Sequence, residues 1–198
     1  LLDAAQTRDA VDIALPLDAC DTFLEAMGGS PAGNASKRAD VLLARIRRQS
    51  VVLVPVEIKF YGAGAADSHA LPQPGAATRE AVSQVAATVA SLKQALERRR
   101  LIEGTTDADL WDNAFATLIE SGLRLSDETH GDLAPTSTEV LQSLVRGESA
   151  LQVGSPVVVY FQHGDDVEPG FHAHTDVEAA AGNYGCLIAR PRLVFQAV

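Results

Sequence analysis

Residues 51–60 have the sequence Val51-Val52-Leu53-Val54-Pro55-Val56-Glu57-Ile58-Lys59-Phe60. A short apolar run that is rich in β-branched residues is typical of a buried strand. Successive strand side chains alternate between two faces, so we expect Glu57 and Lys59 to point to the same face. Because burying an unpaired charge is costly, an apolar strand that keeps both charges is expected to use them.

The residues before this strand predict its partner in a β-hairpin. Residues 39–46 form a second strand-like run, and residues 47–50, Arg-Arg-Gln-Ser, separate the two runs. If the two ends of this turn face one another, Asp40 lies directly opposite Glu57, with the side chains about 5 Å apart. Pro55 cannot donate a ladder hydrogen bond, so we expect an unpaired site or a bulge there, and a bulge would shift the register by one residue.

The rest of the chain predicts an α/β fold with a mixed sheet flanked by helices. The strongest helix pattern covers residues 76–100, where apolar residues recur at steps of three and four. The other expected elements are a weak helix at 4–14, an extended piece at 15–17, helices at 21–27, near 107–120 and near 137–147, a strand at 157–161, and one or two strands within 184–197. We expect loops at 28–36 and 61–75 and a polar, turn-rich segment at 163–182.

The composition indicates one domain over residues 1–198. The net charge is −10, but it is uneven: residues 1–100 carry +1 and residues 101–198 carry −11. The first half holds two basic clusters, Arg45/Arg47/Arg48 and Arg98/Arg99/Arg100. This distribution leaves DNA binding open.

Two further features bear on the compartment. The sequence indicates neither a membrane span nor a signal peptide, because it holds no apolar run of sufficient length and no basic-then-apolar segment, so no membrane partner is expected. Cys20 and Cys186 lie far apart in the sequence, which favours two reduced and mostly buried thiols in a cytoplasmic protein.

The hairpin brings two carboxylates and a lysine together at the end of a sheet. Carboxylate oxygens hold hard divalent cations such as Mg²⁺. A bound cation polarises a phosphoryl group and makes water a better nucleophile. A neighbouring lysine can position or deprotonate that water and offset the charge that grows on the phosphate oxygens. The residues therefore indicate metal-assisted phosphodiester hydrolysis.

Asp40 on one strand, Glu57-Ile58-Lys59 on the next, and a long helix after them resemble the PD-(D/E)xK nuclease superfamily. The resemblance implies a restriction endonuclease-like fold, with a core at about 15–100, strands after 155 and an acidic helical insertion at about 103–150. It makes Asp40 and Glu57 metal ligands, with the Ile58 carbonyl as a third. Lys59 becomes the catalytic lysine, and Gln84, early in the helix, orients the substrate or the lysine.

The resemblance also implies an activity and a setting. The activity is hydrolysis of DNA with Mg²⁺ or Mn²⁺, in a prokaryotic restriction, repair or antiviral defence system that includes a larger assembly and an ATPase. Two departures concern the motif: Ala39 stands where many members have proline, and either Asp18 or Glu25 is a candidate for an additional acid.

Several alternatives remain open at this point. Glu57 and Lys59 could form a surface salt bridge on an exposed strand end, which contributes little to stability. A nuclease-like fold with a silent metal site could dock a partner protein through its acidic half. A sequence-reading DNA binder would need a basic face, which the sequence does not reveal. His172 and His174 form a weak candidate metal site with Asp176, whereas His69 and His163 are expected to be solvated.

Overall fold

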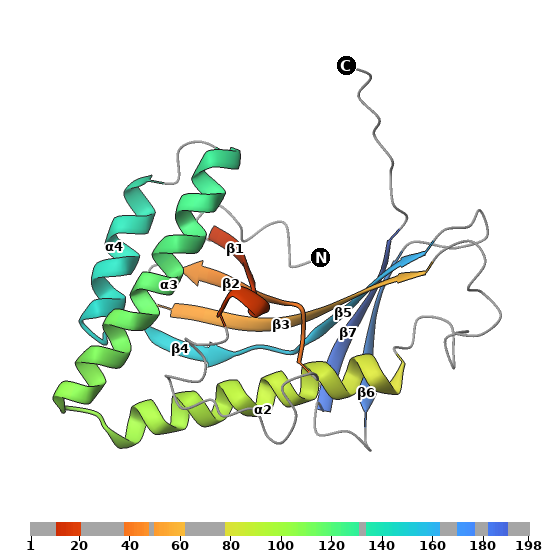
Figure 1. Cartoon of the computed structure of the whole chain (residues 1–198), viewed down its shortest axis with the longest axis horizontal. Coiled ribbons are helices and arrows are strands. Elements are labelled where there is room, and N and C mark those ends of the chain that lie inside the picture. Colours follow the sequence, from red (N-terminus) through yellow and green to blue (C-terminus); the bar gives the residue numbers. More distant parts are fainter. Residues whose placement is uncertain are drawn as a thin grey trace.

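The structure is a computed structural model that describes residues 11–20, 38–47, 50–61, 78–130, 134–162, 170–176 and 182–189. It has an α/β architecture, with helices packed against a mixed seven-stranded sheet (Figure 1). The strands are β1 (Val11–Pro16), β2 (Val41–Arg47), β3 (Ser50–Tyr61), β4 (Ala150–Val153), β5 (Val157–Gln162), β6 (Gly170–Asp176) and β7 (Gly182–Ala189). The helices are η2 (Leu17–Cys20), a 3-10 helix, and α2 (Arg79–Leu101), α3 (Thr106–His130) and α4 (Ala134–Val145).

The strand order is β1-β2-β3-β5-β7-β6, and β4 also pairs with β3. The first three strands form an antiparallel meander, whereas β3 is parallel to both β4 and β5. A parallel return to the same sheet needs a long crossover, which the three helices α2, α3 and α4 supply between β3 and β4. β7 is parallel to β5, and β6 is antiparallel to β7.

The predicted hairpin register is confirmed. Arg47 faces Ser50, and the pairing continues without a break to Val41 opposite Val56. Pro55 lies opposite Leu42 in this continuous register, so no bulge shifts the pairing of β2 with β3, and the alternative of an unpaired site applies.

The unpaired site at Pro55 lies on the other side of β3. The carbonyl of Leu53 accepts from Gly154 N at 2.8 Å, so the odd-numbered residues of β3 direct their backbone groups toward β4 and β5. β4 pairs with β3 up to Leu53, and β5 begins opposite Val56. The proline therefore falls at the break between β4 and β5, where its missing N–H removes no ladder hydrogen bond.

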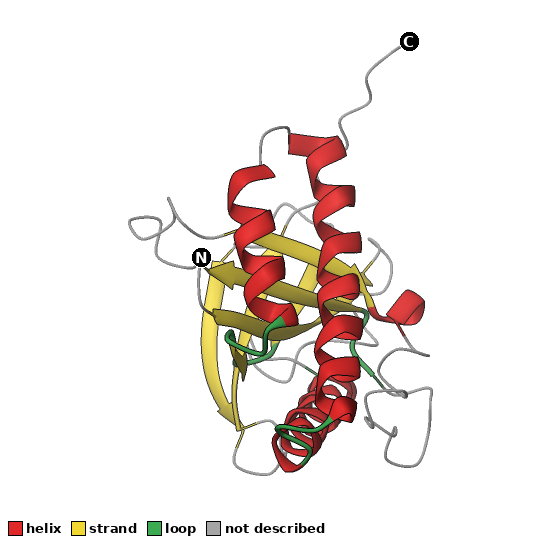
Figure 2. Ribbon diagram, turned by 90° about the vertical axis from the view of Figure 1, so that its left-hand side faces the viewer, coloured by secondary structure: helices red, strands yellow, loops and turns green. Residues whose placement is uncertain are grey.

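The apolar core lies between one face of the sheet and the helices. Alternate residues of β1, β2 and β3 are buried, as the period of a strand requires. They form one cluster with buried residues of α2, α3 and α4, including Val85, Leu92, Phe115, Ile119 and Leu144. Figures 1 and 2 show α3 and α4 side by side at the β1 end of the sheet, with α2 running along β3.

Three sequence predictions about these elements are wrong. Residues 11–14 belong to β1 and not to a helix, because Ile13 and Leu15 alternate with exposed neighbours and pair with β2. The segment at 163–182, expected to be turns, contains β6, and β4 was not predicted. Helix α3, which was expected near residues 107–120, is longer than expected and reaches His130.

Other predictions match the structure or lie outside its described part. The helices expected at 76–100 and near 137–147 correspond to α2 and α4, and the strand expected at 157–161 corresponds to β5. The helix expected at 21–27 and the loop at 28–36 lie outside the described residues, as does the loop at 61–75 beyond Tyr61. Among the described helices, none is long and apolar enough to cross a membrane.

Candidate active site

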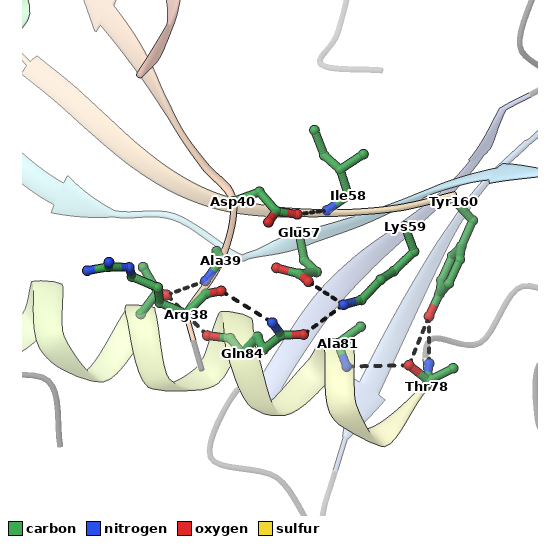
Figure 3. Close-up of polar contacts among 11 residues, drawn as sticks. Arg38, Ala39, Asp40, Glu57, Ile58, Lys59, Thr78, Ala81, Gln84 and Tyr160 are labelled. Carbon is green, nitrogen blue, oxygen red and sulfur yellow. Dashed lines mark hydrogen bonds and ion pairs between the residues drawn. The ribbon is translucent and has the colours of Figure 1, made fainter. Parts of the chain in front are cut away.

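The candidate site lies where β3 continues past the first residue of β2. Glu57 and Lys59 point from β3 toward α2, and Gln84 points from α2 toward them (Figure 3). Asp40 stands one residue before β2 begins, beside the same part of β3. The structure thus brings together the four side chains that the sequence singled out.

Glu57 is a buried carboxylate with one oxygen unpaired. Its side chain is 1% exposed, and Oε1 lies 2.7 Å from Lys59 Nζ. Among the described residues, Oε2 has no hydrogen-bond partner. Burial raises the pKa of Glu57, the hydrogen bond from Lys59 opposes that rise, and the charge of Asp40 adds to it. The charge of Lys59 and the backbone N–H of Asp40 lower the pKa by smaller amounts, so the net direction is upward. The interpretation as a surface salt bridge is therefore wrong.

Lys59 connects the strand to the helix. Its ammonium donates to Gln84 Oε1 at 3.0 Å as well as pairing with Glu57. Burial tends to lower the pKa of Lys59, but the hydrogen bond to Glu57 and the charges of Glu57, Glu80 and Asp40 outweigh it, and the pKa is raised. Lys59 is therefore a cation at neutral pH in this arrangement.

Gln84 is held at both ends of its amide. Its oxygen accepts from Lys59, while Nε2 lies 3.5 Å from the carbonyl oxygen of Arg38, to which it donates. These two contacts fix which end of the amide faces Lys59. The prediction that a glutamine early in this helix lies near the lysine is confirmed.

Asp40 is exposed, yet its position is fixed by several contacts. Its Oδ2 accepts a hydrogen bond from Ile58 N at 2.8 Å, and its backbone carbonyl accepts from Leu17 N at 2.9 Å. The preceding residue, Ala39, is 1% exposed and donates its N–H to Thr88 Oγ1 at 2.9 Å. The carboxylate of Asp40 is thereby directed along β3.

The backbone N–H and C=O of Ile58 face the side of β3 where Asp40 lies. Its N–H points to the side of β3 where Asp40 lies. The N–H and C=O of one strand residue point to the same edge, so the Ile58 carbonyl also faces this side. The pairing of β2 with β3 ends at Val56, so of the described strands only β5 pairs with β3 at Ile58.

Three residues that support the site were not predicted from the sequence. Thr88 follows Gln84 by one helical turn, and its hydroxyl also donates to the Gln84 carbonyl at 3.1 Å. Tyr160 is fully buried beside Lys59 in the strand register, and its hydroxyl oxygen accepts from the backbone N–H of Thr78 at 2.7 Å. Thr78 is the N-cap of α2, so Tyr160 ties the start of this helix to the sheet.

Of the remaining candidates, Asp18 is described with its side chain, His172 and His174 only by their backbones, and the others lie outside the described residues. Asp18 is 94% exposed, with its Oδ1 3.9 Å from Arg38 Nη2, whereas Glu25, His69 and His163 are not described. The backbones of His172 and His174 pair with Cys186 and Tyr184, and the side chains of the two histidines are not described.

Both basic clusters contribute side chains to ion pairs. Arg45 binds Asp12 through two hydrogen bonds of 2.7 and 2.6 Å. Arg99 likewise forms a bidentate pair with Asp112, with hydrogen bonds of 2.7 and 2.5 Å. These two arginines serve structural pairs, so they offer little free positive charge to a phosphate backbone.

The donor set at the site fits a hard cation. Asp40 and Glu57 supply carboxylate oxygens, and the Ile58 carbonyl is a third oxygen on the same side, which is the ligand type that Mg²⁺ and Mn²⁺ take. Within the described ranges, no group of three or more His, Cys, Asp or Glu side chains is placed to hold a metal ion. A cation here would therefore depend on two carboxylates, backbone oxygen and water.

Comparison with known proteins yields no relative for this chain. No family model matches it, and no curated protein or solved structure matches it either.

Proposed function

We propose that this chain is a Mg²⁺- or Mn²⁺-dependent DNA endonuclease of the PD-(D/E)xK type, with a restriction endonuclease-like form of the α/β fold. The observation that carries the proposal is the buried Glu57, whose Oε2 is unpartnered among the described residues although Lys59 and Asp40 stand beside it. A buried oxygen without a partner costs free energy, which a bound cation would recover.

Asp40, Glu57 and the Ile58 carbonyl are the groups that would hold the cation. When bound, the cation supplies Lewis-acid polarisation of the phosphoryl group and an activated water. The Ile58 N–H already holds the Asp40 carboxylate in place, so little side-chain ordering remains for binding to accomplish.

Lys59 acts as a fixed positive charge. Its raised pKa keeps it protonated, and Gln84 holds its ammonium from the helix side. An ammonium in this position stabilises negative charge that develops on the phosphate oxygens during hydrolysis. Gln84 positions the lysine and, through Arg38, couples it to the segment that carries Asp40.

The biological setting rests on the resemblance alone. It is a cytoplasmic restriction, repair or antiviral defence system, in which the chain works with a larger assembly that includes an ATPase.

The proposal is tested by measuring DNA cleavage with Mn²⁺ for the wild type and for Lys59→Ala. The panel contains single-stranded, duplex and modified DNA, each with and without the metal. Lys93→Ala is the matched control, because Lys93 is an exposed lysine of α2. We expect Lys59→Ala to abolish cleavage and Lys93→Ala to leave it unchanged. Equal cleavage by all three proteins would contradict the proposal.

A calorimetric titration with Mn²⁺ separates the nuclease from the silent interaction module. We expect binding that is lost in Asp40→Asn and in Glu57→Gln and retained in Asp109→Asn, which changes a carboxylate in the first turn of α3. Absence of Mn²⁺ binding by the wild type would favour the module that docks a partner protein.

A further inference from the structure

Phe60 is an unusually exposed aromatic residue next to the candidate site. It follows Lys59 directly in β3, and its side chain is 75% exposed. Alternation along the strand directs it to the sheet face opposite Glu57 and Lys59. A single exposed apolar side chain is common on protein surfaces, but this ring directly follows Lys59, so it is placed where it can contact a substrate bound at the site.

The ring is held in a fixed orientation. Phe60 faces Phe161 of β5 in the strand register, and the two rings stack with centroids 4.9 Å apart and planes 11° from parallel. One face of Phe60 is therefore covered by Phe161. A ring that stacks on a neighbour through one face and is otherwise mostly exposed can stack on another planar ring through its second face.

Phe60 also lies in the part of β3 that extends beyond its pairing with β2. The pairing of β2 with β3 ends at Val56, and of the described strands only β5 pairs with β3 beyond that point. A polymer that brings one phosphate to Lys59 would pass this edge. Phe60 stands one residue further along the same strand, about 4 Å away in backbone distance.

The charge of the chain favours one kind of polymer. Duplex DNA binds proteins mainly through phosphate neutralisation by a basic surface. The half of the chain that contains the site, residues 1–100, carries a net charge of only +1, and Arg45 and Arg99 in this half are paired with Asp12 and Asp112. Unpaired nucleotides also expose their base faces, which stack on aromatic side chains and add binding free energy beyond the phosphate contacts.

We propose that Phe60 stacks on an unpaired base and that the substrate of the site is single-stranded DNA or a single-stranded segment. This inference rests on the proposed nuclease function for its setting. It concerns binding, so its test does not require cleavage.

The test measures fluorescence anisotropy of labelled oligothymidylate and of a labelled hairpin duplex in EDTA, where metal-dependent cleavage is blocked. The variants are Phe60→Ala, Phe60→Leu and Phe60→Trp, with Leu110→Ala as the control because Leu110 is an exposed apolar residue of α3. We expect Phe60→Ala and Phe60→Leu to weaken single-strand binding by roughly 5- to 100-fold. Phe60→Trp and the control are expected to bind as the wild type does.

A spectroscopic signature distinguishes stacking from a structural effect. Oligonucleotides that contain 2-aminopurine should lose fluorescence on binding the wild type, and lose less on binding Phe60→Leu. Unchanged single-strand affinity in Phe60→Ala, or equal losses for the strand and the duplex, would overturn the inference. In either case Lys59-dependent cleavage could persist, so this failure is distinct from failure of the proposed function.

Discussion

Ala39 and Thr88 are joined by a buried hydrogen bond that fixes the Asp40 segment to helix α2. The backbone N–H of Ala39 donates to Thr88 Oγ1 at 2.9 Å, across 49 positions of sequence. The same hydroxyl donates to the carbonyl of Gln84, whose side chain contacts Lys59. One side chain thus connects the segment that carries the aspartate with the helix that holds the lysine.

Thr88→Val should impair both stability and catalysis. Valine keeps the shape of threonine but leaves the buried Ala39 N–H without a partner, which costs about 1–2 kcal/mol. Because Asp40 follows Ala39 directly, we expect cleavage to fall by roughly tenfold when the aspartate is less firmly placed. Urea unfolding and cleavage rates measure the two effects.

Thr117→Val is the matched control for this variant. Thr117 also donates its hydroxyl to the carbonyl four residues earlier, at 2.9 Å, but it lies on the exposed face of α3. We expect a change in unfolding free energy within about 0.5 kcal/mol and normal cleavage. Equal behaviour of the two valine variants would contradict the role assigned to Thr88.

Glu57→Gln should remove metal binding and change how the stability of the protein depends on pH. The folded-state pKa of Glu57 is raised, mainly by burial, above its ordinary value of 4.5. A raised pKa means that the carboxyl favours folding at low pH and that this contribution is lost as the pH rises through the folded value. Glutamine does not ionise, so the unfolding free energy of the variant should rise relative to that of the wild type between pH 5 and pH 7.5.

Thermal unfolding in EDTA at the two pH values measures this gain. Glu97→Gln is the control, since the Glu97 side chain is 62% exposed and its pairing with Arg100 is at the surface. We expect no gain in that variant between the two pH values. A Glu57→Gln protein that loses stability relative to the wild type as the pH rises would show that the ionised carboxylate is well paired.

The sequence predicts the central part of the site because that part depends on local pairing. Residues 40 and 57 flank one pair of antiparallel strands, so the neighbourhood of Asp40 and Glu57 follows from the pairing of Arg47 with Ser50. The uncertainty about Pro55 disappears in the structure because β4 ends and β5 begins beside it. That break depends on strands about 100 residues later, which the hairpin itself does not indicate.

The supporting contacts could not be predicted for the same reason. Thr88 and Tyr160 act across 49 and 82 positions of sequence, and their partners are backbone N–H groups that carry no sequence signature. The sequence favours a helix where β1 lies, because a short alternation of polar and apolar residues forms a strand only when a partner such as β2 is available to pair with it. The strand β1 and the contacts of Thr88 and Tyr160 therefore depend on residues that are distant in the sequence, and local sequence patterns do not predict them.

Cys186 should be inert to thiol reagents while the protein is folded. It is fully buried, and burial raises the pKa of its thiol from 9.0 to about 11. The thiolate is the reactive form, so at pH 8 both access and ionisation disfavour the reaction. In a Cys20→Ala background, a chromogenic disulfide reagent should label Cys186 only after addition of denaturant. Rapid labelling of the folded protein would contradict the buried position in β7.

The pair of Arg99 and Asp112 should contribute more to stability than the other ion pairs of the helices. The two side chains are only 15% and 8% exposed, and the pair joins α2 to α3 with two hydrogen bonds. Asp112→Ala leaves the arginine charge without its partner in a nearly buried position, so we expect a loss of about 2–3 kcal/mol in unfolding free energy.

Glu120→Ala is the comparison, because Glu120 pairs with Arg124 along the exposed side of α3, where the arginine is 76% exposed. An exposed ion pair at a spacing of four residues on a helix contributes about 0.3–0.5 kcal/mol to the unfolding free energy. Chemical unfolding in low and high salt distinguishes the two pairs, since salt screens exposed charges more strongly than buried ones. We expect a large, nearly salt-independent loss for Asp112→Ala. A small loss that vanishes in high salt would mean that the pair is accessible to solvent and does not lock α2 against α3.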